Sequence, residues 1–236
     1  MYKIIQKFVT KNRTYKILKP VGVALHETAN AGSTALNHYT YFNGGDRNSL
    51  AHIFVDWNYA NDIIQLAPLN ECTWHAKEPA NSMFISVEMC RPKTHNVEQF
   101  NKVWNKCVWL FADIFINTLK ITKITKDNLM SHDEIRLKWK NTNHTDPTQL
   151  LKEYGKTMDN FRNAVQNEIN KQLIQEVFEL FKDEKDISTW AKDSVKRVSD
   201  LGFIKGNELG EFKPKNGITR EEFAVVLDRL LKYLGK

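Results

Sequence analysis

Three short apolar runs limit the fold most, because each has the length and the β-branched or aromatic content of a buried β-strand. They are VGVALHET (21–28), SLAHIFVDW (49–57) and MFISVEMC (83–90). From Asn96 the apolar period changes to that of a helix and continues to Leu119, behind a capping pair formed by Asn96 and Gln99. Strands interleaved with long helices predict an α/β domain over residues 1–165.

The composition is that of a soluble globular protein, with 42% hydrophobic and 26% charged residues in a chain of 236. No run reaches the roughly 18 apolar residues of a membrane span. The opening segment MYKIIQKFVTKNRTYK lacks the apolar block and the cleavage site of a signal peptide. We therefore expect a protein that is made in the cytoplasm without a signal peptide and has no membrane partner.

The net charge of +6 is unevenly distributed. Residues 172–236 contain 12 basic and 12 acidic side chains, so the whole excess lies in the residues before them. A basic surface suits an anionic partner such as nucleic acid or a bacterial cell wall. The basic residues are scattered and form no stripe with interleaved aromatic residues, so we do not expect nucleic acid. A solvated surface accounts for most of these charges.

The cysteines Cys72, Cys90 and Cys107 are odd in number and follow no paired spacing. This pattern predicts reduced thiols and no disulfide framework. Cysteine peptidase chemistry, with Cys72 or Cys90 beside a histidine, is an alternative that no sequence motif supports.

The segment SHDEIRLKWKNTNHTDP (131–147) is polar, rich in breakers and longer than most loops, so we expect a functional loop here. It contains His132, His144 and Asp146, and His26 ends the first predicted strand. A catalytic zinc site takes three histidine or carboxylate ligands and leaves the fourth position open. Residues delivered from a strand end and a loop meet that requirement, although seven histidines allow other combinations.

Glu88 shares one face of the third predicted strand with Phe84 and Ser86. An unpaired carboxylate is costly among strand residues, so we expect Glu88 to have a partner or a function. His38 and His95 are interpreted as ordinary surface or hydrogen-bonded histidines.

Six motifs together resemble the type 2 N-acetylmuramoyl-L-alanine amidases in order and approximate spacing. They are ALHET (24–28), AHIFVD (51–56), WHA (74–76), ISVEM (85–89), SHDE (131–134) and HTDP (144–147). The resemblance covers residues 1–165, and the family comprises zinc amidases of phage endolysins and wall-recycling enzymes, related in fold to peptidoglycan recognition proteins. It implies a central mixed β-sheet flanked by helices, and one Zn²⁺ held by His26, His132 and Asp146.

The same resemblance implies roles for other residues. Glu88 would transfer protons, and His144 stands where many relatives have a lysine that stabilises the oxyanion. Its charge near pH 7 then depends on its surroundings. Trp74 and His75 would lie beside the substrate groove, with core packing and a supporting hydrogen bond as their respective alternatives. His52 is interpreted as structural.

Residues 187–236 form a predicted all-α module of two helices around a glycine-bounded loop. Thr219 and Glu222 make a capping box for the last helix. This part resembles a single S-layer homology module, a type that binds secondary polymers of Gram-positive walls, and GITREEF (217–223) matches its signature. Thr219, Arg220 and Glu221 are therefore candidate wall-binding residues, and residues 166–186 would be a helical linker.

These patterns predict a peptidoglycan hydrolase that cleaves the amide between N-acetylmuramic acid and L-alanine. We expect a phage endolysin that lyses a Gram-positive host and acts on the wall after release. The alternative is a non-catalytic peptidoglycan-binding protein that has lost the metal. Since S-layer homology modules usually occur as three in a row, we also expect the single copy to form a homo-oligomer.

Overall fold

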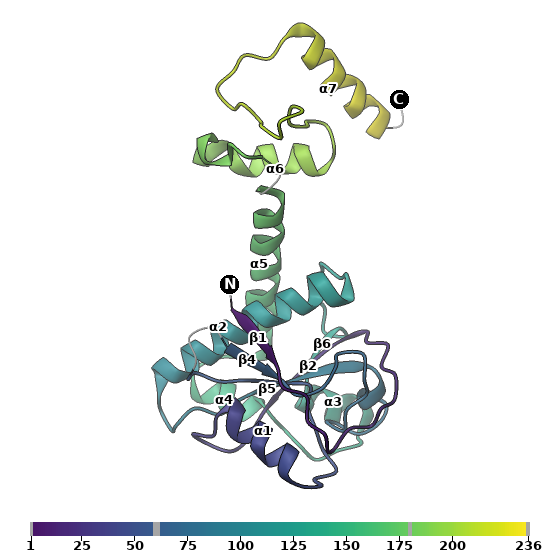
Figure 1. Cartoon of the computed structure of the whole chain (residues 1–236), viewed down its shortest axis with the longest axis vertical. Helices are drawn as coiled ribbons and strands as arrows, with labels where there is room; N and C mark the ends of the chain where they lie inside the picture. Colours follow the sequence, from purple (N-terminus) through teal and green to yellow (C-terminus); the bar gives the residue numbers. More distant parts are fainter. Residues whose placement is uncertain (1, 59–61, 179–180, 235–236) are drawn as a thin grey trace. The chain divides into compact units, whose positions relative to one another are not determined.

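The computed structural model describes residues 2–58, 62–178 and 181–234 (Figure 1). The chain divides into two compact units, Met1–Ile169 and Asn170–Lys236, which are described separately below. Among the described residues, no helix combines the length and the apolar character that crossing a membrane requires.

The described residues of the first unit form a six-stranded sheet in the order β1-β4-β3-β5-β2-β6. Every neighbouring pair is parallel except β3 and β4, which are antiparallel, so the predicted mixed sheet is confirmed. The three runs predicted as strands form β2, β3 and β5. The strands are β1 (Lys3–Gln6), β2 (Gly22–Glu27), β3 (Ile53–Val55), β4 (Asp62–Gln65), β5 (Phe84–Met89) and β6 (Leu129–Ser131).

Helices border this sheet in Figure 1. They are α1 (Ala35–Gly44), α2 (Val97–Asp113), α3 (His132–Trp139), α4 (Thr148–Glu153) and α5 (Met158–Phe178), with a 3₁₀ turn at Ala80–Ser82 and a π-helical turn at Ile114–Leu119. Helix α2 begins at its predicted cap, because the Asn96 side chain accepts a hydrogen bond from the Gln99 backbone. Phe111 of α2 meets Phe161 of α5 edge to face at 4.9 Å, and both rings are fully buried.

Two helices cover the sheet face that carries the site. Paired residues of neighbouring strands point to the same face, which places His26, Glu88 and Phe54 together. Helix α1 packs there through His38, whose ring stacks on Phe54 at 5.0 Å. Helix α3 packs there through Ile135, which is buried in a cluster with Ala24, Phe84 and Met130.

The predicted loop over residues 131–147 is wrong in its first half, where the chain forms helix α3. Ser131 caps this helix by accepting from the Glu134 backbone at 3.1 Å, and the Glu134 carboxylate accepts from the Ser131 backbone at 2.9 Å. This capping box starts a helix in a segment whose composition resembles a loop. Helix α5 begins at Met158, after Gly155 with φ +65°.

The second unit contains helices α6 (Lys192–Asp200) and α7 (Arg220–Tyr233), with short 3₁₀ turns at Glu184–Asp186 and Thr189–Ala191. The predicted helix–loop–helix arrangement is confirmed, and so is the capping box of Thr219 and Glu222. Phe181, Ile187 and Phe203 are buried, whereas the apolar side chains of α7 are largely exposed.

Candidate metal centre and active site

Three side chains converge at the carboxyl ends of parallel strands. His26 lies near the end of β2, His132 opens helix α3 directly after β6, and Asp146 precedes Pro147. The Nδ1 atoms of His26 and His132 are 3.1 Å apart. The Asp146 carboxylate lies 3.2 Å from the first and 3.1 Å from the second. The sheet therefore gathers residues that are more than a hundred positions apart in sequence.

Local structure fixes each of the three. His26 belongs to a strand that is buried along its whole length and paired on both sides, by β5 and β6. The Ser131 cap sets the position of His132 at the first turn of α3. The segment with Asp146 is joined to the same turn, because the Asp133 N–H donates to the Asp146 carbonyl at 3.1 Å.

The cluster fits a zinc ion in its donor set and spacing. Zinc takes nitrogen ligands at about 2.0–2.1 Å and carboxylate oxygens at about 2.0–2.2 Å, so tetrahedral ligands lie about 3.4 Å from one another. The three donor atoms here are close to that separation. On the other side of its ring, His26 Nε2 lies 2.9 Å from Nδ1 of His75. Such a hydrogen bond on the far nitrogen is the usual way to orient a histidine ligand.

Burial and proximity set the protonation of the cluster. Desolvation lowers the pKa of His26, and the hydrogen bond with Asp146 only partly opposes it. For Asp146, burial would raise the pKa, but the hydrogen bonds and charges of His132 and His26 hold it well below its usual range. The cluster therefore favours a neutral His26 and an ionised carboxylate, the forms that bind a metal.

Glu88 lies beside the cluster on β5, at the position that pairs with His26. Its Oε2 atom is buried and has no hydrogen-bond partner. Burial, followed by the charges of Asp146 and Glu27, raises the pKa of Glu88 well above its usual value. A carboxyl group held in this way can carry a proton near neutral pH, which is the property of a general acid or base.

One pocket of about 490 Å³ opens on the side of His132. Trp74, His75, His132 and His144 line it, together with Asn48, Ser49, Ala76, Lys77, Asn81 and Thr142. The His144 side chain is 65% exposed and stacks on the His132 ring at 4.9 Å. Trp74 is 42% exposed, so its ring is available to a ligand and is not fully used in packing. His144 and the predicted substrate-binding pair therefore lie around one hollow.

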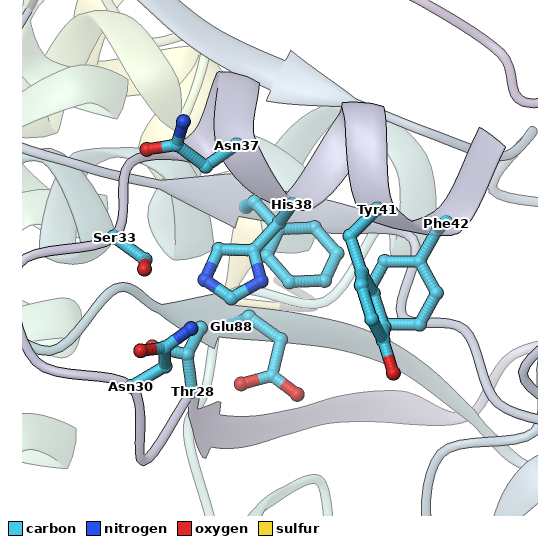
Figure 2. Close-up of a pocket in the computed structure, with 9 residues that line it drawn as sticks. Thr28, Asn30, Ser33, Asn37, His38, Tyr41, Phe42 and Glu88 are labelled. Carbon is cyan, nitrogen blue, oxygen red and sulfur yellow. The ribbon is translucent and has the colours of Figure 1, made fainter. Parts of the chain in front are cut away.

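A second pocket, of about 300 Å³, lies between helix α1, the segment that follows β2, and Glu88 of β5 (Figure 2). Glu88 lines it with Thr28, Asn30, Ser33, Asn37, His38, Tyr41, Phe42 and Phe54. This pocket is not predicted from the sequence, because helix α1 was not expected and His38 was interpreted as an ordinary histidine. The local signal was the pair Thr34 and Asn37, which forms a capping box at the start of α1.

The remaining histidines have other surroundings. His52 is fully buried, with Nδ1 2.8 Å from Ser86 Oγ and Nε2 2.7 Å from the Glu71 carbonyl. Desolvation lowers its pKa to about 4, as a structural histidine requires. His95 is exposed and lies 3.6 Å from Glu153.

The three cysteines are buried and free. Burial raises the pKa of both Cys90 and Cys107, so neither is an available thiolate at neutral pH. Cys72 Sγ lies 3.4 Å from the Ile17 carbonyl oxygen, and Cys72 is not a member of the His26–His132–Asp146 cluster. This arrangement gives no support to the cysteine peptidase alternative.

In the second unit a groove of about 590 Å³ lies between the loop and helix α7. Glu221 lines this groove, whereas Thr219 is engaged in capping α7. Three basic side chains, Lys205, Lys213 and Arg229, and three acidic ones, Glu211, Glu221 and Glu222, line the groove, so its charges balance. The roles of Thr219, Arg220 and Glu221 in wall binding stay predictions.

The fold and the site define an α/β protein with a His–His–Asp cluster at the carboxyl ends of parallel strands. The chain belongs to the N-acetylmuramoyl-L-alanine amidase family, whose model matches residues 17–149. A second match, to the S-layer homology domain, covers residues 180–224. Both predicted resemblances are thereby confirmed.

Relatives of known name extend this result. Protein Ami of Listeria monocytogenes is 27% identical over 88% of this chain and 24% of its own length. A probable N-acetylmuramoyl-L-alanine amidase of Bacillus licheniformis is 28% identical over 74% of this chain and 50% of its own. The chain thus spans half or less of these two proteins.

Solved structures support the fold. Staphylococcus aureus AmiA, crystallised with its ligand, superposes with a TM-score of 0.63 over 72% of this chain and 85% of that one, at 21% identity. The catalytic domain of XlyA gives 0.55 over 69% and 99%, at 26% identity. A mutant endolysin from Bacillus subtilis gives 0.54 over 70% and 99%, at 28% identity.

Proposed function

We propose that the protein is a zinc-dependent amidase that hydrolyses the bond between the lactyl group of N-acetylmuramic acid and the L-alanine of the stem peptide. The observation that carries this proposal is the convergence of His26, His132 and Asp146 next to a buried Glu88, in a chain of the amidase family. The relative from Bacillus licheniformis named as a probable amidase supports the same substrate.

His26, His132 and Asp146 would hold the metal. Zinc at this site supplies Lewis acidity, which polarises an amide carbonyl and makes water acidic enough to ionise near neutral pH. The protein's part is to keep the His26 imidazole neutral and the Asp146 carboxylate ionised, and to orient His26 through His75.

Glu88 moves the proton. As the C–N bond of the amide breaks and a C–O bond forms, Glu88 takes a proton from the attacking water and delivers it to the leaving nitrogen. The products are the carboxylic acid of the lactyl group and the free amine of the stem peptide. His144 beside the cluster can donate a hydrogen bond to the carbonyl oxygen as it gains negative charge.

The glycan would lie in the pocket with Trp74 and His75. An exposed tryptophan ring next to hydrogen-bonding groups suits one face of a sugar. His75, which lines the same pocket, would orient the His26 ring through a hydrogen bond, since His75 Nδ1 lies 2.9 Å from His26 Nε2.

Glu88 favours a catalytic role for the protein over the alternative, a non-catalytic binding protein. A carboxyl that is buried without a hydrogen-bond partner costs stability, and peptidoglycan binding alone gives no reason to keep it. A complete set of metal donors beside it supports the same choice.

The second unit would bring the enzyme to the wall. Its match to the S-layer homology domain supports a secondary wall polymer as the partner. The mutant endolysin among the structural relatives supports a phage endolysin that reaches the wall after release and lyses a Gram-positive host. Removing residues 170–236 should weaken binding to intact walls and leave cleavage of soluble fragments nearly unchanged.

The second unit would also self-associate. Helix α7 exposes Phe223, Leu227 and Leu231, and a lone helix pair buries too little apolar surface to be secure by itself. Copies from other chains can cover this surface.

The deciding experiment treats purified cell walls with the zinc-loaded protein and identifies the new end groups. A new amino group on L-alanine is the expected result. New reducing ends would indicate a glycosidase, and wall binding without any new end group would indicate the non-catalytic alternative.

A further inference from the structure

The pocket between α1 and β5 contains two buried polar atoms that no protein group satisfies. They are Nε2 of His38 and Oε2 of Glu88. Figure 2 shows both side chains facing the same hollow, His38 from the helix and Glu88 from the strand. Buried polar groups in proteins are nearly always hydrogen-bonded, so an unsatisfied pair beside a hollow indicates a ligand that supplies the partners.

His38 is held rigidly and presents its ring to this hollow. The ring stacks on Phe54 with 18° between the planes, and the residue is 8% exposed. Desolvation lowers the pKa of His38 to about 4, against a smaller opposing effect of Asp56. The imidazole is therefore neutral at pH 7 and offers one donor and one acceptor. It can hydrogen-bond an uncharged polar group without forming an ion pair with Glu88.

The sheet order shows which part of the substrate would reach this pocket. Glu88 of β5 has β2, with His26, on one side and β3, with Phe54, on the other. A residue that protonates the leaving nitrogen must lie next to the leaving group. The leaving peptide therefore starts at Glu88, and the hollow between α1 and β5 is the pocket that Glu88 and His38 line, together with residues that follow β2 and with Phe54 of β3. The pocket with Trp74 remains for the sugar.

The lining matches an uncharged peptide segment. Asn30, Ser33 and Asn37 supply amide and hydroxyl groups, and Tyr41 and Phe42 supply aromatic surface. Glu88 is the one ionisable carboxyl in this lining, and no lysine or arginine is part of it. A free carboxylate would find no cation there, whereas backbone amides of a peptide would find both donors and acceptors.

We propose that His38 is a specificity-determining residue of this enzyme, whose imidazole hydrogen-bonds a backbone amide of the first residues of the leaving stem peptide in the pocket between α1 and β5. The proposal rests on the proposed function, because Glu88 as proton donor sets the direction of the substrate. It assigns the peptide to the α1 side and the sugar to the Trp74 side.

The test measures binding to the zinc-loaded full chain by calorimetry, with the uncharged N-acetyl-L-alanyl-D-glutamic acid diamide and N-acetylmuramic acid as separate probes. His38→Phe keeps an aromatic ring on Phe54 and removes both nitrogens. Peptide affinity should fall roughly tenfold, the worth of one hydrogen bond, with affinity for the sugar unchanged. His38→Gln, which restores a polar amide, should recover part of the loss. Trp74→Ala is the matched control and should weaken the sugar alone.

Kinetics on a soluble muramyl peptide give a second readout. His38→Phe should raise KM with little change in kcat, because the contact exists before and during the reaction. Thermal melting checks that each variant is folded. Unchanged peptide affinity in a folded His38→Phe, loss of peptide binding in Trp74→Ala, or no peptide binding by the wild-type chain would each overturn the proposal. Wall cleavage at L-alanine by the wild-type chain tests the proposed function separately from these results.

Discussion

His26 and Glu88 stand at paired positions of two neighbouring parallel strands, and their side chains leave the same face of the sheet. Neighbouring strands are about 4.8 Å apart, so Glu88 lies next to the metal-binding cluster without belonging to it. This geometry separates metal binding from proton transfer. His26, His132 and Asp146 can hold a cation, while Glu88 keeps its carboxyl free to exchange a proton.

We predict that the chain binds one zinc ion and that His26→Ala abolishes this binding. The alanine removes one of three donors from a site that leaves a fourth position open, so two donors remain. Metal analysis of the purified variant should show little zinc. His95→Ala, which changes an exposed histidine outside the cluster, should retain the wild-type content. Full zinc occupancy in His26→Ala would remove this residue from the site.

Glu88→Gln should retain zinc and the fold but lose activity by about 100-fold or more, because the amide cannot shuttle a proton. Wall turnover and metal content are measured on the same preparation. Glu98→Gln removes an exposed carboxyl that pairs with Lys102, and it should be fully active. Near-normal turnover in Glu88→Gln would show that proton transfer occurs elsewhere.

In the metal-free protein, Glu88→Gln should increase the free energy of unfolding relative to the wild type, and this increase should grow as pH rises. The pKa of Glu88 is raised in the folded state, so above its ordinary value of 4.5 the folded chain binds more protons than the unfolded chain. Stability then falls with increasing pH, by up to about 1.4 kcal/mol per pH unit, until the folded pKa is passed. Glutamine has no such titration.

Urea unfolding of the metal-free wild type and Glu88→Gln between pH 4 and pH 8 measures this difference. The other titrating groups are common to both proteins, so they largely cancel. The difference in unfolding free energy, Glu88→Gln minus wild type, should be small near pH 4 and should increase towards pH 8. An advantage that is the same at every pH would mean that the carboxyl does not titrate as its burial requires.

The sequence predicted those parts of the site that depend on strands and on motif order. The runs around His26 and Glu88 carry local β-strand signals, and the parallel pairing of β2 and β5 then brings the two residues together. Helix α3 was missed because its composition is polar, and the capping box of Ser131 and Glu134 was overlooked. The position of His38 could not be predicted, since no local signal shows that α1 packs over β3.

Gly22→Ala should destabilise the first unit without touching the site. A Cβ at Gly22 would clash with the Asn128 carbonyl oxygen, and a backbone atom held next to paired strands cannot easily move away. Overpacking of this kind costs about 1–3 kcal/mol. Thermal or urea unfolding should show the loss, while zinc content stays normal in the folded fraction. Gly44→Ala is the matched control, since a Cβ there has no atom within 4 Å.

The last prediction concerns the exposed apolar side of α7. Phe223, Leu227 and Leu231 are each more than 40% exposed, so their apolar area stays in water unless another surface covers it. If copies of this unit cover one another, light scattering of the full chain should give a multiple of 27.5 kDa. Leu231→Glu should lower that mass to the monomer, because burying the new charge at the interface is costly. Lys232→Glu, at the adjacent exposed position, controls for the charge alone. A monomeric wild-type chain at concentrations that saturate wall binding would reject self-association.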